Sequence, residues 1–206
     1  MKNVFVAIAF LWLMFFAFVG VASSQDDEPQ VMPGTEAAEF QQGGESGQCF
    51  VFNKYVVKTK DSEDGGSDVS VYKRAASAAA ENACETGGEP WLYVADSDNN
   101  SFFGIAGKYL FIDSGRSVDS RGLIVSDLDL HKTIITQGYS GDPKLILGRF
   151  ILFDEPSDKK GPITTCKEAA KWKRQGGGVG WVQGKKLDLE TLKAINVGGL
   201  RCVYME

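Results

Sequence analysis

Short β-type segments follow one another along most of this chain, with little sequence between them. Runs rich in β-branched and aromatic residues alternate with clusters of glycine, aspartate and asparagine, a pattern typical of strands and turns. Most connections are too short for the crossover that parallel strands require, so we expect a mainly antiparallel sheet. The predicted strands cover residues 49–58, 91–95, 102–105, 108–113, 122–127, 132–136, 145–147, 149–154, 180–188 and 200–204, and residues 69–72 could form a strand or start a helix.

Two short helices are predicted between these strands. The first, over residues 73–85, is rich in alanine and stops at the glycine pair that follows. The second opens with Thr165-Cys166-Lys167-Glu168, a capping-box sequence, and ends where Gly176 begins a glycine run. The predicted fold class is therefore α+β, an antiparallel meander or sandwich with two helices.

The amino-terminal segment has the features of an export signal. Lys2 precedes an apolar run over residues 4–22, and Ala22 and Ser24 are the small residues that a processing site needs. The run is longer than the roughly 7–15 residues of a usual signal core and close to the about 20 that span a membrane. We therefore predict a cleaved signal over residues 1–24, with an uncleaved membrane anchor as the alternative. Both fates make the rest of the chain secreted or periplasmic.

The four cysteines agree with an oxidising compartment. All of them lie beyond the leader, and their spacing lacks the close pairs of a zinc site, so two disulfides are expected. Three pairings exist, and the sequence does not choose among them. We favour Cys49–Cys84 and Cys166–Cys202, because each pair would join one predicted strand to one predicted helix. Each bridge closes a loop of about 35 residues.

Composition divides the rest of the chain into two parts. Residues 25–47 are rich in Gln, Glu, Asp and Gly and have few apolar side chains, so we predict a disordered acidic linker. Residues 48–206 have the length of one globular domain. The formal net charge is −5, which disfavours binding to nucleic acid.

The sequence offers little chemistry. The only histidine, His131, falls in a predicted hairpin turn, so a Ser-His-Asp arrangement is disfavoured. The acidic stretch 96–100 lacks the glycine of a calcium loop, and both this stretch and 61–66 lack its final glutamate, so turns rich in Asp and Asn explain them. Gly176-Gly177-Gly178 follows a helix, whereas a phosphate loop precedes one. We therefore predict no cofactor and no metal.

The strongest candidate for a binding site is the polar stretch 113–122, predicted as a loop between two strands. Its candidate residues are Ser114, Arg116, Asp119 and Arg121. The two arginines could bind a carboxylate or phosphate with paired hydrogen bonds. Alternatively, the loop is solvated and its arginines pair with its own aspartates.

One segment is echoed along the chain. Residues 107–113 match residues 148–154 in residue character at every position, with a period that is typical of β-propeller blades. A closed propeller needs at least four blades, and the predicted helices occupy places where blades would lie. We keep a small propeller-like interaction domain as an alternative to two similar strands of one meander.

Part of the chain resembles a group of uncharacterised exported bacterial proteins. The resemblance rests on residues 107–115, 121–128 and 187–192, together with Cys166, Trp172, Arg201 and Cys202. It implies export and a Cys166–Cys202 bridge, and it brings no activity. Ser114-Gly115 is also similar to the Ser-Gly loop with which periplasmic lysozyme inhibitors bind a cationic enzyme.

Together these features predict a non-catalytic binding or inhibitor-type module with an unknown protein or glycan partner outside the cytoplasm. The competing enzyme hypothesis is a glycan hydrolase that uses two of the carboxylates Asp113, Asp127, Asp154 and Glu155 as acid and base.

Overall fold

The fold consists almost entirely of antiparallel strands. The computed structural model describes residues 30–205 apart from 64, 86, 98 and 118–119, and the predicted signal over 1–24 lies outside this part. The first sheet contains β1 Phe40–Gly44, β2 Gly47–Val51, β3 Tyr55–Asp61, β4 Ser67–Lys73 and β5 Leu92–Val94. The second contains β6 Ser101–Ala106, β7 Tyr109–Ser117, β8 Ser120–Asp127, β9 Lys132–Ile146, β10 Phe150–Pro156, β11 Gly178–Asp188 and β12 Lys193–Met205.

Both sheets are meanders in which each strand pairs with the next one along the chain. The predicted antiparallel arrangement is therefore confirmed, and the ambiguous segment 69–72 belongs to β4. The predicted α+β class is confirmed only in part. The described chain is mostly β, and its helices are short: α1 Ala80–Ala83, η1 Ile163–Thr165 and α2 Ala169–Arg174.

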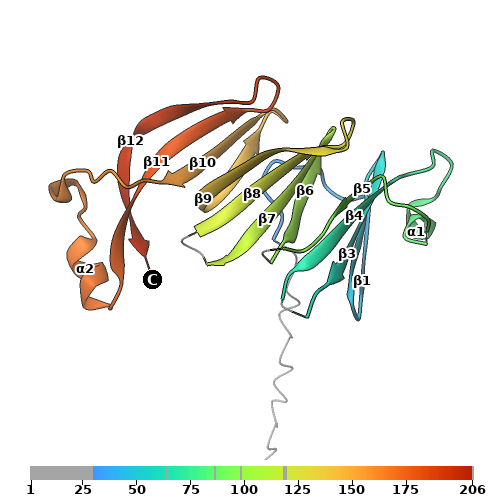
Figure 1. The fold of residues 1–206 in the computed structure, drawn as a ribbon, viewed down its shortest axis with the longest axis horizontal. Coiled ribbons are helices and arrows are strands. Elements are labelled where there is room, and N and C mark those ends of the chain that lie inside the picture. Colours follow the sequence, from blue (N-terminus) through green and yellow to red (C-terminus); the bar gives the residue numbers. More distant parts are fainter. Residues whose placement is uncertain (1–29, 64, 86, 98, 118–119, 206) are drawn as a thin grey trace, which may run out of the picture.

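Strand β9 divides the second sheet into two parts. Its first half pairs with β8, its second half pairs with β10, and residues predicted as two strands form this single long one. The molecule thus has three layers side by side: β1–β5, then β6–β8 with the start of β9, then the end of β9 with β10–β12 (Figure 1).

The middle layer is buried on both faces. Leu110 and Ile112 of β7 belong to the core shared with the first sheet, whereas Tyr109 and Phe111 belong to the core shared with the third layer. Side chains of a strand alternate between its two faces, so a strand between two layers must be apolar at every position. This explains the uninterrupted apolar run at the start of β7.

The segment predicted as a disordered linker is part of the fold from residue 30 onward. Met32 is buried, and the amides of Met32 and Glu36 donate to the carbonyls of Phe103 and Ile105 on the edge strand β6 at 2.8 and 2.7 Å. The prediction is wrong for residues 30–47 because it counted the apolar content of the segment alone. Hydrogen bonds to an existing sheet edge and one well-buried side chain also favour order.

Both predicted disulfides are present. Cys49–Cys84 and Cys166–Cys202 have Cα–Cα distances of 6.0 and 5.7 Å. The first links β2 to the residue after α1, and the second links β12 to the residue after η1. Trp172 packs against the second bridge.

The helices are shorter than predicted. Residue 73 ends β4, and only residues 80–83 of the range 73–85 are helical. The Arg74 guanidinium binds the carbonyls of Phe52 and Ala78 and stabilises a turn before α1. The predicted capping box does not form either. The hydroxyl of Thr165 donates to the carbonyl of Pro162, and α2 begins without a side-chain cap.

Among the described residues, no helix is long and apolar enough to cross a membrane.

Candidate functional site

The stretch predicted as a binding loop is a β-hairpin. β7 continues to Ser117 and β8 starts at Ser120, so most of residues 113–122 are paired strand. Ser114 lies opposite Gly122, and a bulge follows it. The loop assignment was wrong because glycines and polar residues in this stretch serve a bulged hairpin.

The structure describes the side chains of only two of the four predicted binding residues. Ser114 and Arg121 lie on neighbouring strands. Arg116 belongs to β7, but its side chain lies outside the described part of the structure, and so does the whole of Asp119. The predicted role of these residues in binding stays a prediction.

Arg121 forms a buried ion pair. Its Nε lies 3.0 and 2.9 Å from the two carboxylate oxygens of Asp113, its Nη2 also donates to Asp113, and the Tyr139 hydroxyl donates to the same carboxylate at 2.6 Å. The guanidinium lies near the rings of Phe103 and Tyr139. Burial, followed by the hydrogen bond to Asp113, raises the pKa of Tyr139 far above its ordinary value. This cluster stabilises the junction of β7, β8 and β9.

The four carboxylates of the hydrolase hypothesis lie in four separate ion pairs. Asp113 pairs with Arg121, Asp127 with Lys108, Asp154 with Arg201, and Glu155 with Lys185. An acid and base pair needs two carboxyl groups beside one cleft with pKa values moved apart. Burial raises the pKa of Asp127, but the hydrogen bond and positive charge of Lys108, together with the hydrogen bonds from the amides of Leu130 and Asp129, outweigh it, so the pKa lies below its ordinary value. The arrangement gives no support to this hypothesis.

The echo seen in the sequence is a structural repeat with three members. The hairpins β3–β4, β7–β8 and β10–β11 each start with a basic residue followed by an aromatic one: Lys54-Tyr55, Lys108-Tyr109 and Arg149-Phe150. The carbonyl of each basic residue accepts the amide of the residue just after the partner strand, from Arg74, Leu128 and Leu189, at 2.9, 2.8 and 3.0 Å. The first member, Lys54-Tyr55, was missed, although its basic-aromatic pair before a β-branched run is visible in the sequence.

The described strands do not form the closed propeller that was considered as an alternative. A propeller needs at least four separate blades, whereas here the described strands form two sheets, with β9 shared by two layers. The repeat instead produces equivalent contacts between successive layers. The Trp91 indole N–H donates to the carbonyl of Leu128 at 2.8 Å, and the Tyr109 hydroxyl donates to that of Leu189 at 3.2 Å.

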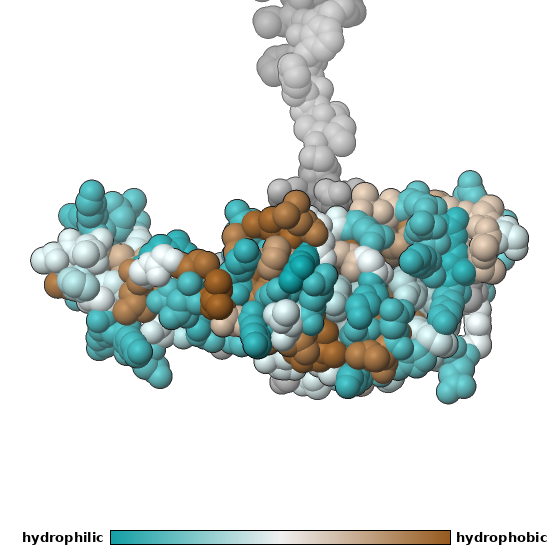
Figure 2. All heavy atoms as spheres, turned by 90° about the horizontal axis from the view of Figure 1, so that it is seen from above, coloured by the Kyte–Doolittle hydropathy of each residue, from teal (hydrophilic) through white to brown (hydrophobic). Residues whose placement is uncertain are grey.

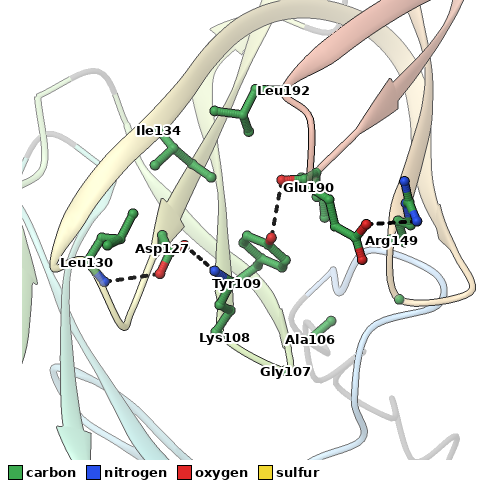
Figure 3. A pocket seen from close by; sticks show the side chains of 12 residues that line it. Ala106, Gly107, Lys108, Tyr109, Asp127, Leu130, Ile134, Arg149, Glu190 and Leu192 are labelled. Atoms are coloured by element: carbon green, nitrogen blue, oxygen red, sulfur yellow. Dashed lines mark hydrogen bonds and ion pairs between the residues drawn. The ribbon is translucent and has the colours of Figure 1, made fainter.

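A pocket of about 590 Å³ opens where the second and third hairpins meet. Tyr109 lies at its floor, and Leu130, Ile134 and Leu192 line one side, as Figure 3 shows. Leu130 and Leu192 are 57% and 48% exposed, so each presents a large apolar surface to solvent. Leu130 lies in the turn between β8 and β9, and Leu192 lies in the turn between β11 and β12. The two turns have equal lengths, and the last residue of each has a positive φ, 53° at His131 and 56° at Leu192.

The polar groups of this pocket are already paired with one another. Lys108 Nζ lies 2.7 Å from Asp127, and Arg149 lies 2.6 Å from Asp188 and 2.8 Å from Glu190. Figure 3 shows the Lys108–Asp127 and Arg149–Glu190 pairs among the residues that line the pocket. The pocket is therefore apolar at its wall, with neutralised charges around it, an arrangement suited to holding an apolar group.

One ion pair of this pocket gives a pH prediction. The hydrogen bond from Arg149 lowers the pKa of Asp188 to about 2, compared with about 3.9 in an unfolded chain. The stabilisation from Asp188 is therefore full above the unfolded pKa and is lost as the pH falls through about 2. We expect Asp188→Asn to melt at a lower temperature than the wild type at pH 5 and at the same temperature near pH 1.5. Thermal melting between about pH 1.5 and 5 tests this prediction, with the exposed Asp158→Asn as the control. A difference in melting temperature between Asp188→Asn and the wild type that stays constant with pH would contradict it.

The two acidic stretches considered for calcium lie side by side. The Ser62 hydroxyl donates to Asp96 at 2.8 Å, and the amide of Asn100 donates to the same carboxylate at 2.7 Å. The carboxylate oxygens thus accept hydrogen bonds from the surrounding turns. Among the described residues, no group of three or more His, Cys, Asp or Glu side chains gathers as a metal site would require.

Comparison with known proteins gives no relative, since no family model, no curated protein and no solved structure matches the chain.

Proposed function

We propose that this protein is a non-catalytic binding module that works outside the cytoplasm and holds an apolar side chain of a partner protein in the pocket between the second and third hairpins. The observation that carries the proposal is the pair of half-exposed leucines, Leu130 and Leu192, facing a pocket whose charged groups are already neutralised. Desolvated apolar anchors surrounded by polar groups supply most of the affinity of protein interfaces. The two disulfides and the leader sequence support export.

A protein partner fits this pocket better than a glycan. Sugar rings are held by open aromatic faces and hydrogen-bonding side chains, whereas the ring at the floor of the pocket, Tyr109, is only 8% exposed. Seen from above, apolar residues also form patches over the middle of the molecule with hydrophilic residues around them (Figure 2). Patches of this kind, bordered by polar residues, are typical of protein-binding surfaces.

Selection from a displayed library of random peptides tests the proposal without knowledge of the natural partner. We expect the enriched peptides to share one or two large apolar residues, and we expect Leu130→Asp with Leu192→Asp to weaken their binding at least about tenfold in calorimetry, which is about 1.4 kcal/mol. A charge buried against the bound side chain would remain without compensation.

Ile163→Asp is the matched control, since Ile163 is 58% exposed and lies in η1, outside this pocket. Its binding should equal that of the wild type. Peptides without apolar residues, or equal binding by the double variant, would exclude the pocket as the binding site.

A further inference from the structure

The first hairpin of the repeat carries the opposite charge at one position. The residue that faces the aromatic ring across the hairpin is Asp127 opposite Tyr109 and Asp188 opposite Phe150, and each forms an ion pair with the basic residue beside that ring. The equivalent residue opposite Tyr55 is Lys73. At these two positions the second and third hairpins carry a basic and an acidic residue that form an ion pair, whereas the first hairpin carries two lysines, Lys54 and Lys73.

Lys73 lines a separate pocket of about 500 Å³ between the first sheet and the turn β8–β9. Its ammonium lies 3.2 Å from the centre of the Trp91 ring. The ring of His131 meets the same indole edge to face, with the two ring centres 3.8 Å apart. The indole N–H is already bonded to the carbonyl of Leu128, which fixes the ring between the two basic side chains.

Neither basic group of this pocket has an acidic partner in the described part of the chain. Glu89 lines the pocket and Asp129 belongs to the same turn as His131, yet no ion pair joins a described carboxylate to Lys73 or His131. Both side chains are exposed. In a protein with a formal net charge of −5, Lys73 is thus a positive charge without an ion-pair partner among the described residues, and it shares one indole with His131.

We propose that the pocket formed by Lys73, Trp91 and His131 binds an anionic group, a carboxylate or a phosphate. The lysine supplies a fixed positive charge and three N–H donors, and the imidazole of His131 supplies a further N–H. Charge-assisted hydrogen bonds of this kind are among the strong ones. The indole of Trp91 contacts both side chains and orients them. This site is independent of the apolar pocket proposed above.

The single histidine gives a direct probe of the site. Because His131 is the only histidine of the chain, its imidazole C–H signals are unique in an NMR spectrum. We expect titration with inorganic phosphate, and separately with acetate, to shift these signals saturably at constant pH and ionic strength. A response to phosphate alone identifies the ligand group as a phosphate, a response to acetate alone identifies a carboxylate, and a response to both identifies a general anion site; each outcome supports the proposal.

Lys73→Asp is the decisive variant, because the other two hairpins already carry aspartate at this position and fold with it. The new aspartate can pair with Lys54, so the anion should bind at least about tenfold more weakly. Lys193→Gln, which changes an exposed lysine after the turn β11–β12, should bind as the wild type does. Lys73→Gln repeats the test without a new charge. A saturable shift that both Lys73 variants retain, or no saturable shift in the wild type, would overturn the proposal.

Discussion

Asp113→Ala is expected to lower the free energy of unfolding by about 3–5 kcal/mol, because it leaves a buried arginine without its counter-charge. The carboxylate accepts hydrogen bonds from Arg121 and from the Tyr139 hydroxyl, and the side chains of Asp113 and Arg121 are only 12% and 15% exposed. Urea unfolding followed by tryptophan fluorescence measures the change.

Two further variants separate charge from hydrogen bonding in this cluster. Tyr139→Phe removes one hydrogen bond to a charged group and should cost about 1.5–3 kcal/mol. Adding Arg121→Met to Asp113→Ala removes the stranded charge and should restore part of the lost stability, so a double-mutant cycle should give a clear coupling energy. The exposed Asp158→Ala serves as control. Additive single effects for Asp113 and Arg121 would contradict a buried pair.

Removing the first disulfide with Cys49→Ala and Cys84→Ala should cost about 3–4 kcal/mol, since the bridge closes a loop of 35 residues. The effect should also be local. α1 has four residues and no side-chain cap, and its contacts with the sheet centre on Ala83 and the bridge. We therefore expect amide hydrogen exchange to accelerate most in the segment between β4 and β5.

The second disulfide provides the matched comparison. Cys166→Ala with Cys202→Ala opens a loop of nearly the same size, with a separation of 36 residues, and should cost a similar free energy. It should leave exchange between β4 and β5 unchanged, because that bridge holds α2 against β11 and β12. Equal acceleration of both regions in both variants would show that the bridges stabilise the molecule globally.

Local chemistry explains why the strands and both disulfide pairs were predictable. Short connections permit only antiparallel neighbours, and each cysteine pair joined elements that were already close along the chain. Helix propensity was a weaker guide. The alanines of 75–79 favour a helix in isolation, but the hydrogen bonds of Arg74 to the carbonyls of Phe52 and Ala78 prevail over that preference.

The pockets were not predictable because each is made by residues from different layers. Leu130 and Leu192 are separated by a long stretch of sequence and resemble ordinary turn residues. Lys73 and His131 likewise contact one ring only because Trp91, just before β5, donates to the carbonyl of Leu128, just after β8. The polar stretch 113–122 attracted attention instead, yet its Arg121 is occupied by Asp113.

Residue order was sufficient for the antiparallel strands and for the echo between residues 107–113 and 148–154, since both depend on the period and spacing of side chains along the chain. It favoured the disulfide pairs Cys49–Cys84 and Cys166–Cys202 without excluding the other pairings. The ordering of residues 32–36 against β6 and the facing of the two turns arose from layer packing. Packing brings together groups that share no local pattern, and its free energy depends on surfaces that exist only once the neighbouring layer has formed.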